Sequence, residues 1–153
     1  MNNIAVIIPA RGGSKGIPNK NLTLIKNKPL IDYTIEFAKL LELEIFITSD
    51  DKNILERGKI HHVNNILRPQ ELATDKSRII DTLLHASEVI NRSKNTFNSL
   101  LILQPTFLIR DLNEVKKGIK LFETSDFESV VALTKMREHP SECIQLKEST
   151  NEW

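Results

Sequence analysis

The chain has 153 residues, of which 40% are hydrophobic and 27% are charged, and its formal net charge is +1 at pH 7. This length and composition fit one globular domain with a sizeable core and exclude global disorder. The near-neutral charge argues against a general nucleic-acid-binding surface. Cys143 is the single cysteine, which excludes an intramolecular disulfide. Because no long apolar span or signal-peptide pattern is present, we expect a cytoplasmic protein without a membrane partner.

Short apolar runs alternate with amphipathic segments along the chain. Residues 4–8 are a branched apolar run closed by Pro9, which predicts a strand buried on both faces. Pro29 can occupy the first turn of a helix, and Asp111 can cap another. In chain order, the expected elements are strands at 4–8 and 45–48, a short strand within 62–67, strands at 99–104 and 129–134, and a weaker strand at 143–146, with helices at 30–41, from 51 to about 59, at 79–90 and at 112–122.

This alternation predicts an α/β protein, with a Rossmann-like three-layer α/β/α architecture and a mainly parallel sheet, in one domain over residues 1–153. In such sheets, ligands bind at the carboxyl ends of the strands. Four polar segments follow expected strands, and we expect them to face one crevice: residues 11–21, residues 49–51, residues 68–75, and residues 104–106 with Arg110.

The segment after the first expected strand combines three glycines, a hydroxyl and three cations in residues 11–21. No Asp or Glu precedes Asp32, so this part of the chain is strongly cationic. Exposed backbone N–H groups and several cations suit a triphosphate. The sequence contains neither the Gly-x-x-x-x-Gly-Lys-Ser/Thr pattern nor Gly-x-Gly-x-x-Gly, so an ordinary P-loop or dinucleotide site is not indicated. The alternative is a solvated connection without a ligand.

The complete loop string, Arg-Gly-Gly-Ser-Lys-Gly-Ile-Pro-x-Lys-Asn at residues 11–21, closely resembles the acylneuraminate cytidylyltransferases. This family makes CMP-activated sialic acids and related nonulosonic acids, and the resemblance implies a fold of the nucleotide-diphospho-sugar transferase type. Further matching segments follow in family order at residues 28–31, 48–51, 68–75, 80–86, 103–106, 110 and 139–140.

The resemblance implies a role for each matching residue. Lys20 matches the family's catalytic lysine, placed to stabilise charge on the α-phosphate and the departing pyrophosphate, and Arg11 is expected to assist it. Gln104 matches a contact to the acidic sugar, and Arg110 could support that loop or pair with a carboxylate. The expected nucleotide and phosphate contacts are Arg11, Gly12, Gly13, Ser14, Lys15, Asn21, Arg68 and Asp75. For each of these residues, the alternative is a surface charge or a loop-packing role.

The metal ligands are not identified by the sequence, although the resemblance implies Mg²⁺ as a cofactor. Asp50 and Asp51 end an expected strand and could hold Mg²⁺, but helix N-capping is the favoured interpretation. His61, His62 and His85 lack metal-ligand spacing, so we expect structural roles for them.

Two features depart from the family. Residues 107–109 are Phe-Leu-Ile where Ser-Pro-Leu is common, so Phe107 replaces a small hydroxyl beside the sugar site. Family members also continue well beyond the equivalent of Trp153, so this domain is expected to lack its C-terminal part, including sugar-binding, magnesium-binding and much of the homodimer-forming segment. We expect transfer of CMP from CTP to the anomeric hydroxyl of a nonulosonic acid, with release of pyrophosphate. The alternatives are a catalytically incomplete nucleotide-binding protein and a sugar-nucleotide transferase that uses another base.

Overall fold

The computed structural model describes residues 3–14, 16–92 and 97–133. Within these ranges, six strands, four α-helices and two short 3-10 helices alternate along the chain. The elements in order are β1 (Ile4–Pro9), η1 (Lys20–Leu22), β2 (Leu24–Ile25), β3 (Lys28–Pro29), α1 (Leu30–Lys39), β4 (Glu44–Ser49), α2 (Lys52–Ile60), β5 (Asn64–Leu67), η2 (Gln70–Leu72), α3 (Ile79–Arg92), β6 (Ser99–Ile102) and α4 (Leu112–Thr124).

Four strands form one parallel sheet in the order β5-β4-β1-β6. Ile7 of β1 is aligned with Phe46 of β4 on one side and with Ile102 of β6 on the other. Because β1 lies inside the sheet and carries branched apolar side chains, residues 4–8 are buried throughout, as the sequence predicts. The chain runs from β1 through β4 to β5 on one side, and it then returns through α3 to β6 on the other side of β1. The strand order therefore reverses between β1 and β6.

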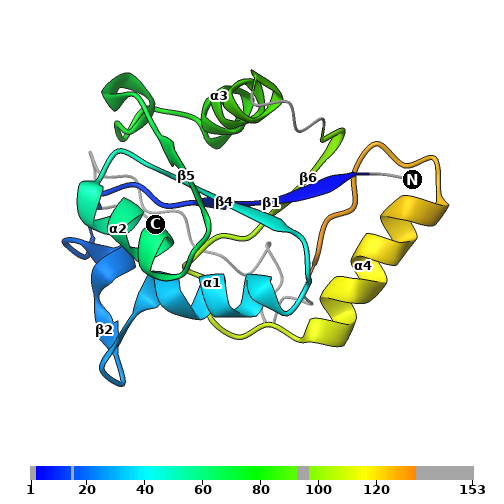
Figure 1. Cartoon of the computed structure of the whole chain (residues 1–153), viewed down its shortest axis with the longest axis horizontal. Helices are drawn as coiled ribbons and strands as arrows, with labels where there is room; N and C mark the ends of the chain where they lie inside the picture. The colour runs from blue at the N-terminus through cyan, green and yellow to red at the C-terminus, as the bar shows by residue number, and fades with distance from the viewer. Residues whose placement is uncertain (1–2, 15, 93–96, 134–153) are drawn as a thin grey trace, which may run out of the picture.

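Helices cover both faces of this sheet, which confirms the predicted three-layer architecture. Figure 1 shows α3 on one side of the sheet, and α1 and α4 on the other. Successive β1 side chains alternate between the two faces: Val6 and Ile8 pack in one core cluster with residues of α1, while Ala5 and Ile7 pack in a second cluster with residues of α3. The sheet therefore packs against a separate core on each face, one shared with α1 and the other with α3.

The helix starts follow the capping signals in the sequence. The Asp51 carboxylate accepts hydrogen bonds from the backbone N–H groups of Asn53 and Ile54, and Asp111 caps α4 in the same manner. Pro29 is the residue before α1 rather than part of its first turn, because it ends the short strand β3. Among the residues that the structure describes, none of the helices is both long enough and apolar enough to cross a bilayer.

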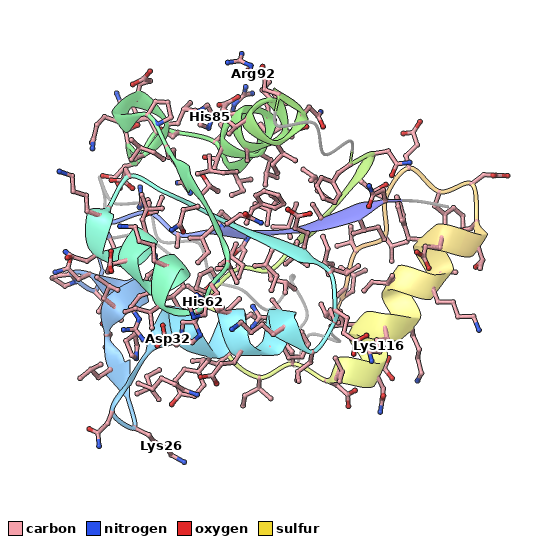
Figure 2. The ribbon with its side chains drawn as sticks, in the orientation of Figure 1. Lys26, Asp32, His62, His85, Arg92 and Lys116 are labelled. Atoms are coloured by element: carbon pink, nitrogen blue, oxygen red, sulfur yellow. The ribbon has the colours of Figure 1, made fainter. Side chains whose placement is uncertain are left out.

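The structure contains one element that the sequence pattern did not predict, the antiparallel hairpin β2–β3. Lys26 and Asn27 occupy its turn with positive φ angles of 48° and 63°. The turn lacks the Asn-Gly or Asp-Gly pair that signals such a hairpin, which explains why it was missed. Figure 2 shows Lys26 at the tip, pointing away from the rest of the molecule.

The strand expected at residues 129–134 is not present in the part of it that the structure describes. Residues 129–133 have neither helical nor strand structure, and Leu133 is 90% exposed. A strand needs a neighbour to bond its backbone groups, and no described strand pairs with this segment, whatever its apolar pattern. The weaker strand expected at residues 143–146 and the motif at 139–140 lie outside the described residues.

Gly58 provides a stability prediction, since it lets α2 approach β5 closely. A Cβ added at Gly58 would lie 2.0 Å from Asn65 Oδ1, and the Asn65 amide donates to the Leu55 carbonyl at 2.8 Å. In Gly58→Ala, the Asn65 side chain must move and lose this bond, so the free energy of unfolding in urea is expected to fall by about 1–3 kcal/mol. Gly118→Ala is the control: no atom lies within 4 Å of its Cβ. It should raise that free energy by up to about 1 kcal/mol through helix propensity. Equal effects of the two changes would contradict the packing argument.

Candidate functional site: a cationic cavity at the sheet's switch point

A cavity of about 290 Å³ opens at the carboxyl ends of β1 and β6, where the strand order reverses. This is the position at which open α/β sheets place their ligands. Three of the four expected polar segments contribute to it. The lining residues are Pro9, Arg11, Ser14, Lys20, Asn21, Arg68, Leu72, Thr74, Ser77, Ile79, Thr82, Gln104, Pro105 and Thr106.

The charge of this cavity is carried by cations alone. Arg11, Lys20 and Arg68 are among its lining residues, and no Asp or Glu is. The ammonium group of Lys20 has no ion-pair partner among the described residues. A site with this composition favours an anionic ligand, because each cation gains a partner when the ligand enters.

Asn21 fixes the path of the loop that follows β1. Its side chain is only 6% exposed, and its amide donates to the Arg11 carbonyl at 2.9 Å. Asn19, just before the 3-10 helix η1, has a left-handed backbone with φ of 51°. This reversal and the Asn21 bond bring Lys20 to the same cavity as Arg11, which lies nine positions earlier in the sequence.

Gly12 packs against the end of β4 instead of lining the cavity. Its N–H donates to Asp50 Oδ1 at 3.0 Å, and a Cβ here would lie 2.8 Å from the Cβ of Asp51. Only a glycine fits at this position, because the backbone of residue 12 approaches the Asp51 side chain so closely. In this structure Asp50 accepts the hydrogen bond of the Gly12 N–H, and the contact of Gly12 with the nucleotide stays a prediction.

Arg11 links the loop after β1 to the loop after η2. Its guanidinium lies 3.0 Å from Asp75 Oδ1 and donates to the Thr74 carbonyl at 3.1 Å. Both side chains of the Arg11–Asp75 pair are partly exposed, so their attraction is screened by water. Asp75 therefore contacts Arg11 at the edge of the cavity and is not itself a lining residue.

Arg68 is the most deeply buried cation of the site, at 5% exposed. It follows β5, and its guanidinium donates to the Thr48 carbonyl at 2.6 Å. Burial lowers the pKa of Arg68, and the nearby charge of Arg11 lowers it further, while Asp50 acts in the opposite direction. The cation is held by β4, so its position is fixed before any ligand arrives.

Arg110 is not a lining residue of the cavity, although the sequence predicts that it faces the same crevice as residues 104–106. Its guanidinium donates to the Gln104 carbonyl and, at 3.2 Å, to Thr34 Oγ1 of α1. Of the two roles left open, support of the loop agrees with this geometry, and pairing with a carboxylate stays a prediction.

Of the predicted site residues, Arg11, Ser14, Lys20, Asn21, Arg68 and Gln104 lie together around the cavity. Gly12, Gly13, Asp75 and Arg110 are not among its lining residues, and Lys15 lies outside the described residues. The geometry groups these residues, and their roles with a ligand stay predictions.

One wall of the cavity consists of hydroxyl and apolar side chains to which the sequence motifs assigned no role. Ser77 binds Thr74 through its hydroxyl at 2.8 Å and donates to the Glu71 carbonyl, which orders the loop before α3. The available signal was position: this loop follows a strand and precedes a helix, where sheets of this class bind ligands. The lining residues in this wall are Leu72, Thr74, Ser77, Ile79 and Thr82.

The described lining of the cavity offers no carboxylate to Mg²⁺. Mg²⁺ is usually bound through one or two carboxylates together with phosphate oxygens and water. No Asp or Glu lines the cavity, Asp51 caps α2, and no group of three or more potential metal ligands occurs among residues 3–14, 16–92 and 97–133. This agrees with capping as the favoured interpretation of Asp51.

The parallel sheet with helices on both faces defines an α/β protein of the Rossmann-like class, and the cavity at its switch point has the charge that suits an anion. The sequence profile of the cytidylyltransferase family matches residues 5–91, more than half of the chain. The chain belongs to the cytidylyltransferase family, which confirms the resemblance of its motifs.

Curated relatives and solved structures agree with this assignment. The chain is 35% identical to an N-acylneuraminate cytidylyltransferase of Escherichia coli, over 93% of this chain and 33% of that protein. It is 32% identical to the CMP-N,N'-diacetyllegionaminic acid synthase of Legionella pneumophila, over 97% of this chain and 65% of that protein. The pseudaminic acid cytidylyltransferase of Campylobacter jejuni is also 32% identical, over 88% of this chain and 59% of that protein. The chain therefore spans from a third to two thirds of the length of these relatives.

The fold is similar to that of a CMP:2-keto-3-deoxy-manno-octonic acid synthetase solved with CTP, with a TM-score of 0.66 and 22% identity. This similarity covers 80% of the present chain and 48% of that chain. A cytidylyltransferase from Leptospira borgpetersenii gives a TM-score of 0.64. The three-layer fold is thus the nucleotidyltransferase type.

Proposed function

We propose that this chain binds CTP in the cationic cavity and provides the nucleotide-binding part of a cytidylyltransferase site. The observation that carries the proposal is the convergence of Arg11, Lys20 and Arg68 on a cavity whose lining residues include no carboxylate. The volume of about 290 Å³ lies near the lower end of the range for small-molecule sites, roughly 300–1,000 Å³. The relatives' names supply the base and the acceptor class: a cytidine nucleotide and a nonulosonic acid.

The proposed reaction is transfer of CMP to the anomeric hydroxyl of the acid. The hydroxyl oxygen attacks the α-phosphorus, the bond from that phosphorus to the bridging oxygen breaks, and pyrophosphate leaves with the bond's electron pair. The hydroxyl proton passes to solvent or to pyrophosphate. Lys20 and Arg11 lower the energy of the transition state by facing the negative charge that develops on the phosphate oxygens.

The surroundings of the reaction are part of this proposal. CTP would enter with Mg²⁺ held mainly by its own phosphate oxygens and water, which supplies charge neutralisation when bound. Gln104, which lines the cavity from the loop after β6, is assigned to the acid. A cytoplasmic location and a homodimer complete the proposed setting, in keeping with the resemblance.

The direct test is the thermal stability of the chain with nucleotides. CTP with Mg²⁺, at about 100 times its dissociation constant, is expected to add about 2.7 kcal/mol and to raise Tm by roughly 5–10 °C. UTP, ATP and inorganic tripolyphosphate are the controls, and each should shift Tm less than CTP does. An unchanged Tm with millimolar CTP would overturn the proposal, and a larger shift with UTP or ATP would assign another base.

Turnover is tested separately by pyrophosphate release with CTP, Mg²⁺ and N-acetylneuraminate. Release above the level seen without the acid supports transfer. Binding of CTP without any release would instead identify a catalytically incomplete nucleotide-binding protein.

A further inference from the structure

We propose that Arg110 is a positioning residue that holds the acceptor loop, residues 104–107, in place from outside the cavity. The inference rests on the proposed function in one respect, the assignment of Gln104 to the acid. It assigns to Arg110 a task different from ligand binding, and it gives Phe107 a part in that task.

The first step is the connection that Arg110 makes. Its two terminal nitrogens donate in different directions, one to the Gln104 carbonyl and one to Thr34 Oγ1 at 3.2 Å. Thr34 is fully buried in α1, within the rigid core of the molecule. The guanidinium therefore ties an exposed loop to a fixed helix.

The second step is the packing of the guanidinium against two rings. Its central carbon lies 5.6 Å from the centroid of the Phe37 ring and 5.7 Å from that of Phe107. Aromatic faces attract a guanidinium and also exclude water from its hydrogen bonds. Phe107 belongs to the loop and Phe37 to α1, so the rings repeat the connection made by the hydrogen bonds. We call Arg110, Thr34, Phe37 and Phe107 the arginine clamp.

The third step concerns what the clamp fixes. The Gln104 carbonyl accepts from Arg110 and also from the Phe107 N–H at 3.2 Å, which closes a turn over residues 104–107. Gln104, Pro105 and Thr106 line the cavity within this turn. Burial lowers the pKa of Arg110, which nevertheless has no carboxylate partner among the described residues. The clamp thus accounts for a half-buried arginine that is not a lining residue of the cavity.

The clamp also accounts for Phe107, which stands where the family commonly has serine. Phe107 is 65% exposed, an unfavourable setting for a ring unless it packs on a neighbour. Its contact with Arg110 provides that packing. Phe107 is therefore assigned to the clamp rather than to contact with the sugar.

The test combines amide exchange with two binding titrations. In Arg110→Met, exchange of the Phe107 N–H measured by NMR should become about tenfold faster, because its turn loses its anchor to α1. The dissociation constant for N-acetylneuraminate should rise about five- to tenfold, while that for CTP stays within about twofold. Arg110→Lys should recover only part of the loss, since an ammonium cannot make both bonds in the guanidinium's geometry.

Arg92→Met is the matched control, because Arg92 is an exposed arginine at the end of α3 that pairs with Glu88 and is not a lining residue of the cavity. It should change none of the three measurements. Phe107→Ser removes one ring without touching the hydrogen bonds, and it should give an intermediate effect. This variant also carries the test if Arg110→Met fails to fold.

The outcomes separate the clamp from the proposed function. Unchanged Phe107 exchange and unchanged acid affinity in Arg110→Met and Phe107→Ser would overturn the clamp. Equal losses of CTP and acid binding would overturn it as well, because they would indicate general disruption. Faster exchange in a chain that never binds the acid would support the clamp and overturn the assignment of Gln104.

Discussion

Replacing Lys20 with methionine is expected to lower the turnover number for pyrophosphate release about 10²–10³-fold, the effect of removing one preorganised charge from a transition state. Lys20 lies in the cavity wall, and its ammonium has no ion-pair partner among the described residues. Methionine retains most of the side chain's length without the charge. CTP affinity should fall much less than turnover, since Arg11 and Arg68 remain in the cavity.

Lys116→Met is the control for this change. Lys116 is an exposed residue of α4, labelled in Figure 2, and it is not a lining residue of the cavity, so its replacement should leave turnover unchanged. If Lys20→Met kept half of the original turnover, the lysine would have only a loop-packing role. The measurement is the initial rate at saturating CTP, compared with the dissociation constant from a direct CTP titration.

The second large effect is expected at Asp32, on stability rather than on activity. Figure 2 shows Asp32 in α1, on the side of that helix where α2 lies. Asp32 is 2% exposed, and its carboxylate accepts both the Nε–H of Arg57, at 2.9 Å, and the Nη2–H. The hydrogen bond with Asp32 raises the pKa of Arg57. Asp32→Asn leaves this arginine without its counter-charge, so the free energy of unfolding at pH 7 should fall by about 3 kcal/mol.

Asp81→Asn provides a matched control in the same molecule. Asp81 also accepts two hydrogen bonds from one arginine, with Arg78 Nε at 3.1 Å and Nη2 at 2.9 Å. That pair lies on the surface, where water replaces the lost partner, so the expected change is below about 1 kcal/mol. Urea unfolding of both variants measures the difference. Similar losses for the two would show that burial does not set the strength of the Asp32 pair.

Much of the architecture could be predicted because the signals were local. Residues 4–8 are apolar throughout, and only a central strand of a parallel sheet buries such a run on both faces. Asp51 and Asp111 cap helices because each carboxylate accepts hydrogen bonds from the free N–H groups of the next turn. This interaction is local and does not depend on where the helix packs. Residues 129–133 show the limit of such signals, since an apolar pattern does not supply the neighbouring strand that hydrogen bonding requires.

The candidate site likewise has a part that the sequence motifs predicted and a part that they could not predict. The motif string placed Arg11, Ser14, Lys20, Asn21, Arg68 and Gln104 in one site, and the cavity contains all six. The string could not indicate that Gly12 would donate to Asp50, because their proximity depends on how β1 and β4 are aligned. Nor could it separate a ligand-binding arginine from one that holds a loop, as Arg110 does, since both lie close to the site in sequence.

The amino-acid sequence was enough to establish the family, the alternation of strands and helices, and the cationic loop, because each depends on residue type and spacing along the chain. Folding brings each of these charged side chains to its partner. Arg11 lies beside Asp75, 64 positions away in the sequence, and Arg57 lies beside Asp32, 25 positions away. Arg110 packs against the ring of Phe37, 73 positions away. The energy of a charge is set by the dielectric and the neighbours around it, and these exist only after distant segments have packed together.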